Sequence, residues 1–88
     1  MIINIKDLKS KIIYRANYRG TKEMDKLLGS FTKKYIDQLK DDELTLLCEL
    51  LDHDDENLYK YNQGLETTIK IDSNMITTLF KKYNYMGE

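Results

Sequence analysis

The chain contains no proline, and its apolar residues recur at the spacing of an α-helix. Three segments carry apolar side chains at positions i, i+3, i+4 and i+7, which places each set on one helix face. The sets are Met24, Leu27, Leu28 and Phe31; Leu44, Leu47, Cys48 and Leu51; and Ile76, Leu79, Phe80 and Tyr83. Because proline is the strongest breaker inside a helix, its absence favours helices over an architecture of strands and turns.

Two shorter apolar patterns indicate further helices. They are Ile5, Leu8 and Ile12 near the N-terminus, and Leu58, Tyr61 and Leu65, whose helix is expected to end near Gly64. We therefore predict an all-α fold, a compact bundle of about five helices with short connections. A chain of 88 residues encloses only one modest apolar core, so we expect a single domain over residues 1–88.

Polar residues and glycines stand where these helices are expected to begin and end. Carboxylates and hydroxyls at a helix start accept backbone N–H groups and meet the positive end of the helix dipole. The candidate caps are Asp41 and Asp42, Asp54 and Asp55, and Asp72 or Ser73. Gly20 is expected to separate the first two helices, and Gly29 to mark a kink or break after Leu28.

The charges are distributed unevenly along the chain, although the formal net charge is only -1. Residues 1–40 hold ten Lys and Arg against four Asp and Glu, whereas residues 41–64 hold one against eight. A basic surface can meet nucleic acid or an acidic protein, but a dedicated nucleic-acid binder usually has a positive domain charge. Most of these charges, taken one by one, are explained by solvation of exposed helix faces.

The sequence offers no apparatus for membrane insertion, metal binding or catalysis. Its apolar runs are far shorter than the roughly twenty residues that span a bilayer, and no signal-peptide core is visible, so we expect a soluble cytoplasmic protein or its organellar equivalent. Cys48 and His53 are five positions apart, but Cys48 lies on an apolar helix face, so we expect a core residue and no metal. One histidine and no supported nucleophile or acid pair predict a protein that is not an enzyme and holds no cofactor.

The segment from Tyr14 to Asp25 is the most informative part of the chain. One interpretation is structural: Gly20 caps the second helix, Glu23 returns to the cap N–H, and Arg19 forms a surface ion pair with Glu23 or Asp25. The other is functional: a backbone without a side chain at Gly20 lets a partner approach closely, while Arg19 and Glu23 offer donors and acceptors beside it. Helical periodicity leaves both interpretations open.

This segment resembles the SdhE family, also called succinate dehydrogenase assembly factor 2. The family's signature is Arg-Gly-x-x-Glu followed shortly by Asp, and the chain reads Arg19-Gly20-Thr21-Lys22-Glu23-Met24-Asp25 within YRGTKEMDKLLGSF, a string similar to the α-proteobacterial and mitochondrial branch. The likeness runs from about residue 11 to about residue 65. Its later part rests on Leu50-Leu51, Asp54, Asp55, Leu58 and Tyr59. Two positions depart from the family, since Asn17 and Tyr61 stand where tryptophan is frequent.

The resemblance implies a small helical assembly factor that binds the flavoprotein subunit of succinate dehydrogenase, and in some bacteria fumarate reductase. Such a factor promotes covalent attachment of FAD without being an enzyme, a nucleic-acid binder or a membrane-inserted protein, and we expect a monomer. The family's functional patch falls on Arg19, Gly20 and Glu23, and the expected partner-binding residues beside it are Asp25, Arg15 and Tyr18. The alternative is a small helical nucleic-acid-binding or regulatory protein that uses the basic first half.

Overall fold

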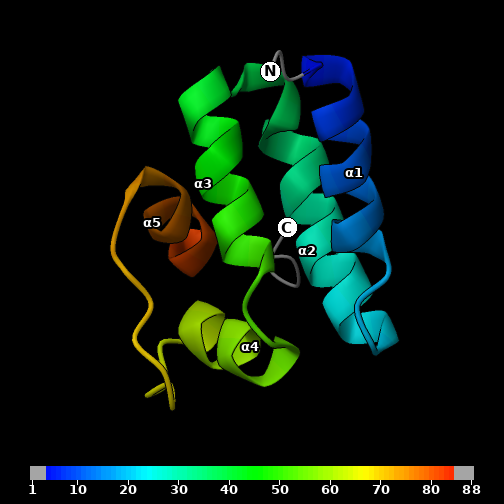
Figure 1. The fold of residues 1–88 in the computed structure, drawn as a ribbon. Coiled ribbons are helices and arrows are strands. Elements are labelled where there is room, and N and C mark those ends of the chain that lie inside the picture. The colour runs from blue at the N-terminus through cyan, green and yellow to red at the C-terminus, as the bar shows by residue number, and fades with distance from the viewer. Residues whose placement is uncertain (1–3, 85–88) are drawn as a thin grey trace.

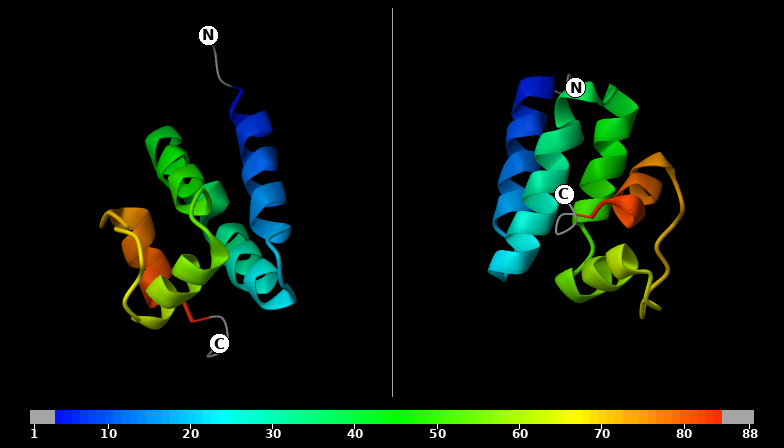
Figure 2. Two further views of the ribbon diagram at one scale, coloured as in Figure 1. Left: turned by 60° about the horizontal axis from the view of Figure 1, so that its bottom comes forward. Right: turned by 180° about the vertical axis from the view of Figure 1, so that it is seen from behind.

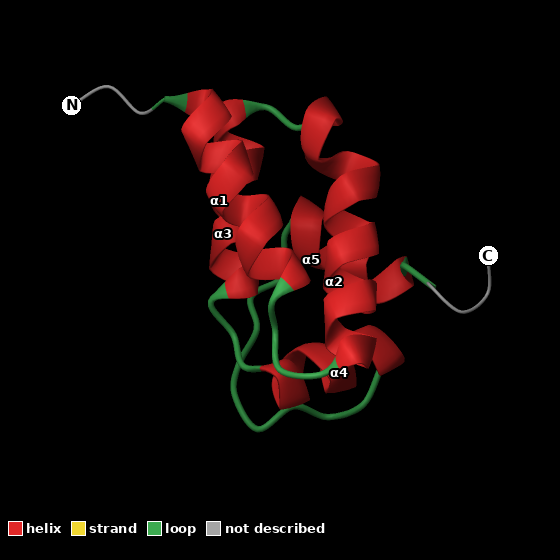
Figure 3. Cartoon of the chain, turned by 90° about the vertical axis from the view of Figure 1, so that its right-hand side faces the viewer, coloured by secondary structure: helices red, strands yellow, loops and turns green. Residues whose placement is uncertain are grey.

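Five α-helices make up the regular structure of residues 4–84, the part of the chain that this computed structural model describes (Figure 1). They are α1 (Ile5–Asn17), α2 (Lys22–Tyr35), α3 (Asp41–Leu51), α4 (Asp55–Gln63) and α5 (Met75–Lys82), and a short 3-10 helix, η1 (Ile36–Gln38), follows α2. These residues contain no strand (Figure 3), so the all-α prediction is confirmed. Within the same range no helix is both long and apolar enough to cross a membrane.

Helices α1, α2 and α3 stand side by side and run in alternating directions (Figures 1 and 2). Helix α1 packs against both α2 and α3, while α5 packs against α3 and α4. Helix α4 lies across one end of the three upright helices, and both the α1–α2 turn and the α3–α4 turn are at this end (Figure 1). Segments that are distant in the sequence are therefore neighbours at the end of the bundle beside α4.

Helices α3 and α5 start with caps that differ from those expected from the sequence. Helix α3 begins after Lys40, so Asp41 lies inside its first turn, and the Glu43 carboxylate accepts the Lys40 backbone N–H at 2.8 Å. Helix α5 is capped by Asn74 instead of Asp72 or Ser73, because Asn74 can exchange hydrogen bonds with Thr77 at 2.8 and 2.9 Å. Such a reciprocal pair satisfies two backbone or side-chain donors at once, which a single carboxylate does not.

The start and the end of α4 follow the sequence prediction. Asp54 is the N-cap, and its side chain accepts the backbone N–H of Asn57 at 3.3 Å. Gly64 ends the helix with a φ of 76°, a left-handed conformation that glycine adopts without the steric cost that a Cβ would bring.

Gly29 does not break α2, so the predicted kink there is wrong. The helix continues through this residue to Tyr35, and Gly29 is buried where α2 meets α1. A Cβ at this position would collide with the side-chain oxygen of Asn17 on α1. The glycine therefore serves the close approach of two helices, which compensates for its low helix propensity.

The core is formed by the apolar helix faces that the periodicity predicted, with Phe31 of α2 near its centre. The Phe31 ring lies 5.1 Å from that of Tyr35, 5.2 Å from that of Phe80 and 5.4 Å from that of Tyr83, measured between centroids. Cys48 packs against this core as expected. Leu65 is an exception, since it follows the end of α4 and is 56% exposed.

Candidate functional site

Arg19 lies between α1 and α2 and binds the α3–α4 turn with all three of its guanidinium nitrogens. Nε donates to Oδ1 of Asp55 at 2.8 Å, Nη1 to the carbonyl of Leu51 at 2.9 Å, and Nη2 to the carbonyl of His53 at 2.7 Å. Its side chain is only 10% exposed. The planar fork of a guanidinium suits such a set of acceptors, so Arg19 joins the two turns at this end of the bundle.

Asp25 fixes the backbone of the same residue. Its carboxylate accepts the Arg19 backbone N–H at 2.5 Å from the first turn of α2. The expected surface ion pair of Arg19 with Glu23 or Asp25 is therefore wrong, since the cation pairs with Asp55. The reason is tertiary: the end of α3 and the start of α4 bring a carboxylate and two carbonyls within reach of a turn that is far away in the sequence.

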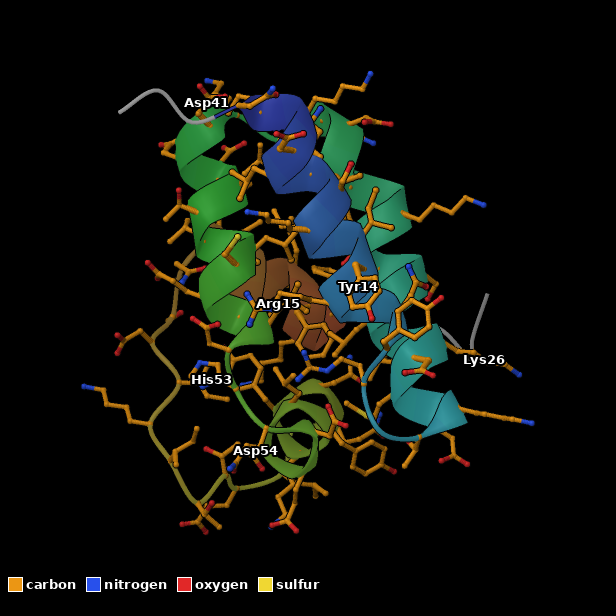
Figure 4. All side chains as sticks on the ribbon, turned by 45° about the vertical axis from the view of Figure 1, so that its right-hand side comes forward. Tyr14, Arg15, Lys26, Asp41, His53 and Asp54 are labelled. Atoms are coloured by element: carbon orange, nitrogen blue, oxygen red, sulfur yellow. The ribbon has the colours of Figure 1, made fainter. Side chains whose placement is uncertain are left out.

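Arg15 and Asp52 make a second and more exposed link between the same parts of the fold. Arg15 Nη2 donates to Oδ1 of Asp52 at 2.5 Å, and both side chains remain partly exposed. In Figure 4, Arg15 points from α1 toward the end of α3. Exposed ion pairs of this kind typically contribute less than about 1 kcal/mol, so Arg19 is the stronger connection.

Gly20 is exposed at the tip of the α1–α2 turn, and its special feature is what lies beside it. A Cβ at Gly20 would be 3.1 Å from Oδ2 of Asp55, the carboxylate that pairs with Arg19. Among the described residues the only glycine with a left-handed φ is Gly64, so close packing, and not an unusual backbone conformation, distinguishes Gly20.

The capping interpretation of this segment is also wrong. Thr21 is the N-cap of α2, and its hydroxyl accepts the Met24 backbone N–H at 3.2 Å. Glu23 is then one position too early to return to the cap. Its carboxylate is exposed and forms no hydrogen bond or ion pair with any residue in the range 4–84.

The six predicted residues thus divide into two groups. Arg19, Asp25 and Arg15 make internal contacts that hold the α1–α2 turn in place. Tyr18, Gly20 and Glu23 are exposed. Tyr18 is 68% exposed, and its ring contacts that of Tyr14 in a tilted arrangement, with 4.6 Å between centroids and 32° between ring planes. Figure 4 shows Tyr14 on the outer side of α1.

Asp55 is the site residue that sequence reasoning missed, because the sequence marks it only as a candidate cap and as part of the acidic pair shared with the family, with no role in the site. Asp54 alone caps α4, which leaves the Asp55 carboxylate, 36 positions from Arg19, available to the guanidinium. The available signal was the presence of two adjacent carboxylates where one is enough for capping. The positions of Asp54 and Asp55 in the sequence do not indicate which distant cation the carboxylate of Asp55 pairs with.

The comparisons with known proteins agree with the resemblance found in the sequence. A family model described as "Flavinator of succinate dehydrogenase" matches residues 10–84. The chain is 39% identical over 51 residues to a protein of Meyerozyma guilliermondii named "Succinate dehydrogenase assembly factor 2, mitochondrial", a stretch that covers 58% of this chain and 38% of that relative. It is 36% identical over 58 residues to the "FAD assembly factor SdhE" of Legionella pneumophila (strain Lens), covering 66% of this chain and 72% of that relative.

The matches differ in how much of each chain they cover. The chain spans less than half of the length of the mitochondrial relatives that it matches. No solved structure matches the chain. The family model, in contrast, covers most of the sequence, including the Arg19-Gly20-Thr21-Lys22-Glu23 motif, and confirms the predicted family. The chain belongs to the family described as the flavinator of succinate dehydrogenase.

Proposed function

We propose that this protein promotes covalent attachment of FAD to the flavoprotein subunit of succinate dehydrogenase by binding that subunit through the exposed α1–α2 turn. The names of relatives that refer to succinate dehydrogenase assembly and to FAD assembly support the proposal. The structural observation that carries it is that Arg19 fixes the turn from inside while Gly20 and Glu23 stay exposed. A surface that is already ordered loses less conformational entropy when a partner binds.

Each motif residue in the α1–α2 turn and in the first turn of α2 has a separate task in this proposal. Gly20 lets the partner's backbone come close, and Glu23 offers a carboxylate that is not used internally. Tyr18 adds an exposed aromatic ring of the kind that is frequent at protein interfaces. Arg19 is a positioning residue, because its donors are occupied by Asp55 and by two carbonyls.

The protein acts on the geometry of its partner and is not itself an enzyme in this proposal. The bond forms between a flavoprotein histidine and the flavin ring, so the reacting groups belong to the partner and its cofactor. A factor that binds one conformation of the flavoprotein more tightly than others raises the population of that conformation. If the histidine faces the flavin in the favoured conformation, the covalent bond forms faster.

The test is to delete the protein in its own host and to measure the flavin that stays covalently bound to the flavoprotein subunit. The readout is the flavin fluorescence of that subunit's band on a denaturing gel. We expect the flavin signal to fall on deletion and to return with the wild-type chain. Gly20→Arg and Glu23→Ala, at equal cellular levels, restore less of the signal. Glu49→Ala, which removes an exposed carboxylate of α3, is the matched control and restores it fully.

Two results would contradict the proposal. The first is an unchanged flavin signal in the deletion strain. The second is full restoration by both Gly20→Arg and Glu23→Ala, because the α1–α2 turn then has no part in the activity.

A further inference from the structure

A groove opens beside the α1–α2 turn, between the first turns of α2 and helix α4. It consists of two adjoining hollows of about 270 and 520 Å³, and Glu23, Met24 and Tyr59 line both. The smaller hollow extends toward Asn62, and the larger one toward Glu56. The groove therefore extends from Glu23 of the Arg19–Glu23 motif to residues of α4, which lie outside that motif.

The groove has an apolar floor and an ordered end. Met24 belongs to the core, so its buried side chain gives the floor a fixed position. Tyr59 is 49% exposed and forms the α4 side. At the end, the Asn62 side chain donates to the carbonyls of Phe80 at 2.8 Å and Tyr83 at 2.9 Å. A site with few mobile parts binds at a low entropic cost.

Three carboxylates line the groove, and two of them already have cations. Asp55 pairs with Arg19 at 2.8 Å, and Glu56 pairs with Lys60 at 3.3 Å. Glu23 has no such partner among residues 4–84. The uncompensated charge of the groove is thus one negative charge, placed beside an apolar floor and a tyrosine ring.

We propose that this groove receives an Arg or Lys side chain of the flavoprotein subunit together with a neighbouring large apolar side chain. The inference rests on the proposed function and names the chemistry of the partner segment. The cation pairs with Glu23, its aliphatic stem packs on Tyr59, and the apolar neighbour lies over Met24. An acidic segment is disfavoured, because its charge would be repelled by Glu23.

The test is to measure the Kd of the purified flavoprotein subunit, loaded with FAD, for the full-length chain and its variants. We expect Glu23→Gln and Tyr59→Ala each to raise Kd about tenfold, the size of effect typical of anchoring residues at an interface. The matched controls are Glu49→Gln on α3 and Met75→Ala on α5, where Met75 is 44% exposed. Each control changes Kd by less than about twofold, as expected of surface positions outside the interface. Circular dichroism confirms that every variant is folded.

Measuring Kd at a series of salt concentrations separates the contribution of the ion pair at Glu23 from that of apolar packing on Tyr59. Added salt screens an exposed ion pair, so it weakens binding of the wild type more than binding of Glu23→Gln. The effect of Tyr59→Ala, in contrast, persists at high salt.

The outcomes distinguish the two proposals. If the wild type binds the flavoprotein and both groove variants bind as tightly as the controls, the groove inference is overturned while the proposed function stands. If the wild type does not bind the flavoprotein, the proposed function fails and the inference fails with it. If Glu23→Gln and the wild type weaken equally with salt, Glu23 does not meet a cation, and the assignment of the occupant is overturned.

Discussion

Arg19 and Asp55 are 36 positions apart in the chain and meet at 2.8 Å, joining the α1–α2 turn to the first residue of α4. The same guanidinium binds the carbonyls of Leu51 and His53, at and just after the end of α3. The last carbonyls of a helix lack partners within the helix, so Arg19 also completes the end of α3. The arginine of the motif thus organises both turns.

Removing this arginine is expected to destabilise the fold strongly. Arg19→Ala leaves Asp55 and two carbonyls without their donors, and we expect a loss of about 2–4 kcal/mol in the free energy of unfolding. Arg19→Lys keeps the charge but loses the fork, and we expect a loss of about 1–2 kcal/mol. Urea unfolding measures both values. The control is Arg15→Ala, whose exposed pair is worth less than about 1 kcal/mol. A loss with Arg19→Ala no larger than with Arg15→Ala would show that the buried network adds nothing.

A side chain at Gly20 is expected to disturb the carboxylate of Asp55, which pairs with Arg19 through its other oxygen. The Cβ of Gly20→Ala lies 3.1 Å from Oδ2 of Asp55, so Asp55 has to shift slightly, and we expect a loss of about 0.5–1 kcal/mol. The matched comparison is Gly20→Ala in an Asp55→Ala background. There the substitution costs less, because the crowded oxygen is gone. Equal costs in the two backgrounds, measured by urea unfolding, would contradict the contact.

The helix faces were predictable from the sequence because the periodicity of apolar residues is a local property. Phe31 and Phe80 are both buried as their helical spacing indicated. The resemblance to a known family predicted a functional patch at the motif, and within the motif Gly20 and Glu23 are exposed. What the sequence did not reveal is the direction of the Arg19 side chain, since that depends on where the fold places the end of α3.

The predicted break at Gly29 is wrong for a similar reason. A glycine within a helical pattern lowers the expected helicity, which favours a break when only local propensity is considered. The compensation comes from α1, whose Asn17 side chain occupies the space that a Cβ would need. The contact between Asn17 and Gly29 follows only from the packing of α1 against α2.

The Asn17–Gly29 contact leads to a double-mutant prediction. Gly29→Ala gains helix propensity but forces the Asn17 side chain away from its bond to the Ile13 carbonyl, which is 2.8 Å long. In an Asn17→Ala background nothing has to move, and we expect Gly29→Ala to stabilise the protein by about 0.5–1 kcal/mol. In the wild-type background we expect a gain smaller by about 0.5 kcal/mol or more, or a loss. Thermal unfolding of the four proteins tests this, and additive effects would rule out the contact.

Asp54 predicts how stability changes in acid. Its carboxylate accepts from the Asn57 side chain at 2.7 Å and from the Asn57 backbone N–H at 3.3 Å. These bonds favour the ionised form, and the side-chain bond is the largest cause that holds the pKa of Asp54 below its ordinary value of 3.8. Because the pKa is lower in the folded state, the contribution to stability is present above pH 3.8 and is lost as the pH falls through the folded value.

The variant that isolates this effect is Asp54→Asn, which keeps a good N-cap but cannot titrate. Other carboxylates titrate in the same range, so the quantity to compare is the fall in Tm between about pH 5 and about pH 2.5. We expect a larger fall for the wild type than for Asp54→Asn, because only the wild type loses an ionised cap. A Glu49→Gln variant, which removes an exposed carboxylate of α3 outside any cap, is expected to follow the wild type. If Asp54→Asn also shows the wild-type fall in Tm, the hydrogen bonds from Asn57 do not favour the ionised cap.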